Sequence, residues 1–360
     1  MTLEKALVHQ MIMLGAFTVI STLAVAQTPS PALLVLDRGN PAIDGGDKAS
    51  LAIVDPLTNK IVGRVPVGES PHLMAVSADG KLAFVVNYGW RNPGHTISVI
   101  DVAAQRELRR VDLGPLRRPS GIVVAGGKVY FTAEANNAIG RYDPASNKID
   151  WVIGTGQNHT HMIVLTKDLK TIFTSNVDSN SVTAIEPVPP HHRVDPPDWK
   201  NTVIPVGKGP EGIDISPDDK EVWVAARDDG SISIIDVATK KVTQTLNIQT
   251  KESVRLNFTP DGKMVLVTDG KAGDVVILDA VARKVIKRIN LGKHPINILV
   301  VPDGSHAYVG VSRDNDLAII DLKTLELTGR IPIGAPSDIR FAEKEGNPNG
   351  PSGMAWVETR

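Results

Sequence analysis

The chain has 360 residues, with 39 lysines and arginines against 40 aspartates and glutamates, so its formal net charge is −1. A charge this close to zero, with no long block of one sign, argues against a nucleic-acid partner. The chain contains no cysteine, which excludes disulfides, thiolate metal sites and cysteine nucleophiles.

The first segment has the features of a secretory signal peptide. Lys5 precedes an apolar run from Met11 to Val25, and Ala24-Val25-Ala26 has small side chains where signal peptidase requires them. We therefore expect residues 1–26 to be removed, leaving residues 27–360 as one domain that is periplasmic or secreted. No second apolar span follows and no cysteine stands at the cleavage site, so we expect no membrane anchor and no lipid anchor.

Beyond the signal peptide, one pattern of about forty residues recurs along the chain. The full pattern is a Gly-x-x-Pro turn, an apolar strand, an Asp-Gly-Lys type hairpin, a second strand, a third strand that ends in Asp (Glu186 in the fourth copy), and a fourth strand. Alternating Val, Ile, Tyr and Phe with tight turns predict antiparallel hairpins. The copy that begins at Gly68 predicts strands at residues 73–77, 82–87, 96–101 and 107–113, and the copy that begins at Gly207 predicts strands at 213–216, 222–226, 231–236 and 242–248. Further copies begin at Gly114, at Gly156, near Thr250 and at Gly292.

Each end of the chain holds part of one further copy. Residues 32–37, 50–55 and 60–67 supply three strands, and the segment from Gly350 to Trp356 matches the turn and first strand of the other copies. Six complete copies and one shared copy predict an all-β fold, a seven-bladed β-propeller of four-stranded antiparallel blades that is closed by its two ends. A rival closing strand, Pro336 to Phe341, lies at the more regular spacing.

The second strand of several copies carries a recurring tetrapeptide. It occurs as Phe84-Val85-Val86-Asn87, as Phe173-Thr174-Ser175-Asn176 and as Tyr308-Val309-Gly310-Val311. In this feature the chain resembles the bacterial YVTN-type β-propeller repeat family, over nearly all of its mature length. That resemblance implies an exported propeller, often at the cell envelope, and it does not imply a particular reaction.

A narrower resemblance lies in the fourth copy. The segment from His159 to Leu165, followed by Asp168 and Phe173, resembles the His-x-His segment of the seven-bladed lactonase family, which includes phosphogluconolactonases and muconate lactonizing enzymes. The resemblance implies a hydrolase or lyase. Where that family has Gly-Pro-Arg-His in the next blade, this chain has Gly209-Pro210-Glu211-Gly212. A carboxylate therefore replaces the arginine that would bind an anionic substrate.

The residues that follow the turn prolines are the candidate site. In a propeller, the innermost strand of each blade begins at one mouth of the central channel, so these side chains converge there. Positions two and four residues further on are apolar in every copy, as at Ile213 and Ile215, and are expected to pack between blades. The converging residues are His72, Ser120, His161, Glu211, Val254, Ile296 and Ser352, with Arg255 and Asn297 as neighbours.

The sequence leaves several functions of this mouth open, including whether the protein is an enzyme. One hypothesis is non-catalytic binding of a small polar or anionic ligand, or of an envelope protein partner, without a cofactor, by His72, Ser120, His159, His161, Glu211, Arg255 and Asn297. Another is lactonase-type catalysis, in which His161 is the general base, Glu211 orients it or acts as the acid, and Arg255 holds a carboxylate or oxyanion. A third is a copper or zinc site formed by His72, His159, His161 and His294. In a purely structural role, these side chains would instead hydrogen-bond turn amides around a solvated funnel.

Overall fold

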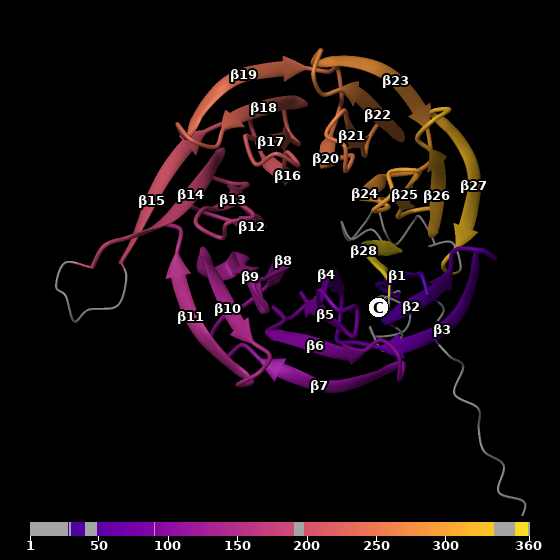
Figure 1. The fold of residues 1–360 in the computed structure, drawn as a ribbon, viewed down its shortest axis with the longest axis horizontal. Helices are drawn as coiled ribbons and strands as arrows, with labels where there is room; N and C mark the ends of the chain where they lie inside the picture. The colour runs from indigo at the N-terminus through magenta and orange to yellow at the C-terminus, as the bar shows by residue number, and fades with distance from the viewer. Residues whose placement is uncertain are drawn as a thin grey trace, which may run out of the picture.

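The protein is a ring of seven four-stranded antiparallel sheets (Figure 1). The computed structural model describes residues 28, 30–39, 49–89, 91–190, 198–334 and 350–358. These residues confirm the predicted seven-bladed β-propeller. The predicted signal peptide, residues 1–26, and the rival closing strand, Pro336 to Phe341, lie outside them. Within the described ranges, no helix is long and apolar enough to cross a membrane.

Six blades are continuous in sequence, and in each the strands follow one another from the channel to the rim. The second and third strands of a blade are buried on both faces, as in β5 (Leu82–Asn87), because each sheet packs between two others, whereas an outermost strand such as β7 (Arg106–Asp112) alternates exposed with more buried residues. The six blades are β4 (Pro71–Val76), β5 (Leu82–Asn87), β6 (Thr96–Asp101) and β7 (Arg106–Asp112); β8 (Pro119–Ala125), β9 (Lys128–Ala133), β10 (Ala138–Asp143) and β11 (Lys148–Gly154); β12 (Thr160–Leu165), β13 (Ile172–Asn176), β14 (Ser181–Val188) and β15 (Asp198–Pro205); β16 (Pro210–Ile215), β17 (Glu221–Ala226), β18 (Ser231–Asp236) and β19 (Lys241–Asn247); β20 (Ser253–Phe258), β21 (Met264–Asp269), β22 (Asp274–Asp279) and β23 (Lys284–Asn290); and β24 (Pro295–Val300), β25 (His306–Val311), β26 (Asp316–Asp321) and β27 (Glu326–Pro332).

The seventh blade joins the two ends of the chain. Its innermost strand is β28 (Pro351–Val357), followed outward by β1 (Ala32–Asp37), β2 (Ser50–Asp55) and β3 (Lys60–Pro66). Strand β28 pairs antiparallel with β1. The structure therefore confirms that the last predicted strand closes the ring, which leaves no blade with an unpaired inner strand.

Apolar side chains from adjacent blades form shared cores. One core joins Leu34 and Ile53 of the closing blade to Met74 and Val85 of the next blade. These side chains are at most 7% exposed. Because each blade packs against both of its neighbours, the ring holds the seven innermost strands around one axis.

Candidate functional site

A β-bulge lies near the start of the innermost strand of every blade. In β16, Pro210 pairs with Ala226 and Gly212 pairs with Ala225, so Glu211 between them has no opposite residue. A bulge re-aims the side chain at the extra position, and bulges are common beside binding sites. The corresponding irregularities in the other innermost strands contain His72, Ser120, His161, Arg255, Ile296 and Ser352.

Two glycines in or next to these bulges let adjacent innermost strands approach closely. A Cβ atom at Gly121 would lie 2.7 Å from the carbonyl oxygen of His161, and one at Gly212 would lie 2.8 Å from the Cα of Arg255. Neither distance is compatible with a side chain unless a backbone moves. The absence of a Cβ at these positions therefore sets how closely the strands that carry the site residues approach one another.

A second set of side chains reaches the same mouth from the loops after the second strands. The second strand of a blade runs antiparallel to the innermost one, so it ends where the innermost strand begins. This set consists of Arg38 after β1, Tyr88 after β5, Glu134 in the 3₁₀ turn η1 (Glu134–Asn136) and Arg227 after β17. These four residues were not among the predicted site residues, although all of them occupy the same place in the repeat, directly after a second strand.

The two sets together line a cavity of about 550 Å³ at the mouth. Its walls contain nine of the predicted residues and charged residues from the second set. The described lining residues are Arg38, Ser70, His72, Tyr88, Arg118, Glu134, His159, His161, Glu211, Arg227, Glu252, Val254, Arg255, His294, Ile296 and Ser352.

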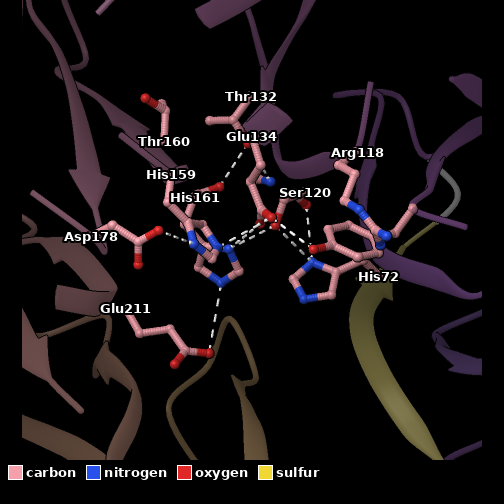
Figure 2. A network of polar contacts seen from close by, with 12 residues as sticks. His72, Arg118, Ser120, Thr132, Glu134, His159, Thr160, His161, Asp178 and Glu211 are labelled. Carbon is pink, nitrogen blue, oxygen red and sulfur yellow. Dashed lines mark hydrogen bonds and ion pairs between the residues drawn. The ribbon is translucent and has the colours of Figure 1, made fainter. Parts of the chain in front are cut away.

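Glu134 connects two histidines from the neighbouring blade (Figure 2). Its Oε1 lies 2.5 Å from Nδ1 of His161, its Oε2 lies 3.2 Å from Nε2 of His159, and Oε2 also accepts a hydrogen bond from the hydroxyl of Tyr88 at 2.8 Å. Burial alone would raise the pKa of Glu134, but the His161 and His159 imidazoles hold it well below its ordinary value. Glu134 is therefore a buried, ionised carboxylate.

Ser120 links the two predicted histidines His72 and His161. Its Oγ lies 2.9 Å from Nδ1 of His161 and 3.1 Å from Nδ1 of His72. Burial, and then the positive charge of Arg38, lower the pKa of His72 well below its ordinary value. His72 is therefore neutral at pH 7.

Glu211 joins two arginines on the other side of His161. Its carboxylate lies 3.3 Å from Nη1 of Arg255 and 3.2 Å from Nη1 of Arg227. Burial would raise the pKa of Glu211, but Arg255 and then His161 and Arg227 lower it below its ordinary value. Nε2 of His161 lies 3.4 Å from Nη2 of Arg255 and 3.7 Å from Glu211. The structure thus brings together all three residues of the predicted catalytic set.

A second buried guanidinium, that of Arg38, faces the same cavity. Its Nε donates a hydrogen bond to the carbonyl of Pro71 at 3.2 Å. Burial, followed by the positive charge of Arg255, lowers the pKa of Arg38 to about 10. Among the described lining residues, positive charge exceeds negative charge, because four arginines (Arg38, Arg118, Arg227 and Arg255) oppose three glutamates (Glu134, Glu211 and Glu252).

Two predicted residues lie apart from this network. Nδ1 of His294 lies 3.0 Å from the hydroxyl of Ser312 and Nε2 lies 3.7 Å from Glu252, while burial lowers the pKa of His294 to about 4. The Asn297 side chain is buried and donates to the carbonyl of Ser352 on the adjacent innermost strand. Asn297 therefore joins two strands and is not among the described residues that line the cavity.

Comparison with known proteins relates the chain to one family and to several solved propellers. The model of the cytochrome D1 heme domain family matches residues 119–304. Hydrazine synthase from Kuenenia stuttgartiensis is 21% identical, with a TM-score of 0.63 over 76% of this chain and 89% of that chain. A putative 6-phosphogluconolactonase from Bacteroides uniformis is 15% identical, with a TM-score of 0.70 over 91% and 99% of the two chains. Another from Bacteroides fragilis is 17% identical, with a TM-score of 0.70 over 94% and 99%.

At these identities the solved structures show a common fold. Among curated proteins the chain has no match. The resemblance to the YVTN-type repeat family stays a prediction.

Proposed function

We propose that this chain, which belongs to the cytochrome D1 heme domain family, binds a small anionic ligand in the cavity at the mouth of its ring. The observation that carries the proposal is the pair of buried guanidinium groups, those of Arg38 and Arg255, facing one cavity. Two like charges in a buried site repel each other, and an anion placed between them removes that cost.

The described residues of the mouth do not fit a haem. The faces of the macrocycle need apolar walls, and the iron needs a ligand atom aimed at it. Val254 and Ile296 are the aliphatic residues among the described lining, and the rest of it is mainly charged or polar. Histidines are present in this lining, as at His72 and His161, so it is the lack of apolar walls that argues against a haem. The proposed role therefore involves no haem.

Arg255 is the main candidate for contact with the ligand. Its side chain is 8% exposed, and its buried Nε has no hydrogen-bond partner among the described residues. A guanidinium binds carboxylate or phosphate oxygens through two parallel hydrogen bonds, so an unused donor favours an oxyanion. Because the arginines supply the positive charge, this role needs no cofactor.

A panel of anions tests the proposal. Thermal unfolding and isothermal titration would be measured with inorganic phosphate, citrate and 6-phosphogluconate. We expect at least one to stabilise the wild type, and Arg255→Gln to weaken its binding about 30-fold or more, the effect of losing a charged hydrogen bond in a buried site. The matched control is Arg110→Gln, since Arg110 pairs with Glu107 on the surface. If no anion binds, or if Arg255→Gln binds as the wild type does, the proposal is wrong.

A second candidate function is hydrolysis of a lactone. Its support is the contact of Nε2 of His161 with Arg255 and Glu211, together with the carboxylate of Glu134 against Nδ1. A carboxylate in that position fixes the imidazole so that Nε2 can take a proton, as in other acid–base sites. We expect His161→Ala combined with Glu211→Gln to abolish turnover of a lactone panel. If the intact protein turns over no lactone, this candidate fails.

We also propose that the protein is exported. The support is the Lys5 and Ala24-Val25-Ala26 pattern of the first residues. Amino-terminal sequencing of the protein from the periplasm or medium should begin at Gln27. A mature protein that begins at Met1 would contradict the proposal.

A further inference from the structure

We infer that Glu134, His159 and His161 form a binding site for one divalent transition metal ion of the zinc or copper class. One ligand atom of each residue lies within 4.8 Å of the others. The site contains two of the four histidines in the metal set expected from the sequence, and a carboxylate that does not belong to that set. The inference does not depend on the anionic ligand.

The donor atoms suit such an ion in kind and spacing. Two imidazole nitrogens and one glutamate oxygen are the protein ligands of a well-known class of zinc sites, and a metal in them keeps a further position open. Tetrahedral ligands about 2.0–2.1 Å from an ion lie about 3.3–3.5 Å from one another. The 3.2 Å contact between Glu134 and His159 is already near that spacing. The 2.5 Å contact between Oε1 of Glu134 and Nδ1 of His161 has to open by about 1 Å for an ion to bind.

The far nitrogen of each histidine also faces a carboxylate. Nδ1 of His159 lies 3.3 Å from Oδ2 of Asp178, and Nε2 of His161 lies 3.7 Å from Oε1 of Glu211 (Figure 2). Histidines that bind metals generally donate their second N–H to a carboxylate or carbonyl, which fixes the tautomer and strengthens the ligand. Without a metal, Nδ1 of His161 carries the proton that faces Glu134, and Nε2 faces Nη2 of Arg255 at 3.4 Å. Metal binding requires the other tautomer, with the His161 proton on Nε2 toward Glu211 and the lone pair of Nδ1 directed at the ion.

The backbone holds the two histidines in these positions. His159 has a φ of 58°, in the left-handed region, and its amide donates to Oδ1 of Asn137 at 3.0 Å. The carbonyl of His161 accepts a hydrogen bond from the hydroxyl of Thr132 at 2.6 Å. Asn137 and Thr132 belong to the blade that also carries Glu134, so one blade positions all three ligands.

The site is closed on one side and open on the other. The side chains of Glu134 and His161 are 5% and 8% exposed, whereas that of His159 is 33% exposed. An ion can therefore enter from the cavity, past His159, into a site that two buried ligands complete. The hydroxyl of Tyr88 and Oγ of Ser120 lie next to the ligands, at 2.8 Å from Glu134 and 2.9 Å from His161, where they can bind a water on the open position.

Metal titration tests this inference. Co²⁺ would be followed by its visible absorption and Zn²⁺ by calorimetry, in a protein with His191 and His192 replaced by alanine, because that pair lies outside the described residues and could bind metal by itself. We expect this protein to bind one equivalent of Co²⁺ or Zn²⁺. Glu134→Gln and His159→Ala should each weaken binding about 100-fold, and Asp178→Asn, at a mostly exposed side chain, should weaken it about 10-fold.

Two variants separate the possible outcomes. His306→Ala, which removes a surface histidine beside Asp321, should bind Co²⁺ as the parent does. Arg255→Gln should bind Co²⁺ at least as tightly, because it removes a positive charge beside His161, even though it should lose the anionic ligand. Less than half an equivalent in the parent, or equal affinity in Asp178→Asn, His159→Ala and the parent, would overturn the inference. If Asp178→Asn still unfolds cooperatively, its loss of metal affinity is not caused by a failure to fold.

Discussion

Oε1 of Glu134 and Nδ1 of His161 lie 2.5 Å apart, although the two residues belong to different blades. The contact joins the end of a second strand in one blade to the start of the innermost strand in the next. It places an ionised carboxylate, 5% exposed, at the interface between the blades. The same contact thus serves the candidate site and the junction of two blades.

Replacing Glu134 should therefore destabilise the protein. Glu134→Ala leaves the hydroxyl of Tyr88 and the two imidazoles without their shared partner in a buried place. We expect a loss of about 3 kcal/mol in the free energy of unfolding, the usual effect of breaking a buried pair. Urea unfolding would measure it. Glu107→Ala, at the exposed pair with Arg110, should cost less than about 1 kcal/mol, and equal losses in the two variants would contradict the account.

Gly212→Ala should disturb both stability and ligand binding. Its Cβ would lie 2.8 Å from the Cα of Arg255, so β16 and β20 must separate. We expect a loss of about 1–3 kcal/mol in the free energy of unfolding, as for other overpacked sites, and weaker binding of any anion found in the panel. The control is Gly154→Ala, where the nearest atom lies at 4.0 Å. Wild-type behaviour of Gly212→Ala would contradict the close approach of the two strands.

Asp214 should make stability depend on pH. Burial raises its pKa to about 6, although it accepts hydrogen bonds from Phe258, Ile215 and Asn257. The folded state thus holds a proton that the unfolded state has released, so this residue's contribution to stability is largest below pH 4 and is lost as the pH rises to about 6. In Asp214→Asn, the free energy of unfolding should fall less over this pH range, by at most about 3 kcal/mol. Urea unfolding of both proteins between pH 4 and pH 7 measures the difference, and parallel pH profiles would exclude the raised pKa.

Deleting residues 351–360 should destabilise the whole ring. It removes β28, which pairs with β1 and contributes Ala355 and Val357 to a core shared with the next blade. We expect the melting temperature to fall by at least 10 °C, or the chain to aggregate, since about 1 kcal/mol shifts the melting temperature of a domain of this size by a few degrees. Deletion of residues 359–360 alone is the control. An unchanged melting temperature after the longer deletion would show that another segment closes the ring.

The repeat predicted the architecture because each blade repeats the same turns and the same apolar alternation. The strand expected at residues 96–101 is β6, and the last strand closes the ring as expected from the match of Gly350 to Trp356 with the other copies. The innermost positions were predicted for the same reason, since a turn proline marks the start of five inner strands and the register of the repeat places the starts of β12 and β20 at Thr160 and Ser253.

The rest of the site comes from the loops after the second strands, and not from the innermost strands. Glu134 lies in a 3₁₀ turn that follows a second strand, and Arg38 and Arg227 follow second strands in loops of different length. All three residues directly follow a second strand. This position is shared around the ring, just as the start of the innermost strand is, so the repeat does indicate it. The separation of His294 from His159 and His161 could not be inferred, because it depends on hydrogen bonds to Ser312 and a contact with Glu252.

The proposed anion site at the mouth of the ring depends on the buried guanidinium groups of Arg38 and Arg255. Anomalous diffraction from crystals soaked in bromide measures this directly. We expect a bromide peak in the cavity within hydrogen-bonding distance of Arg255, and no such peak in Arg255→Gln. Bromide peaks at surface arginines with none in the cavity of the wild type would contradict the claim.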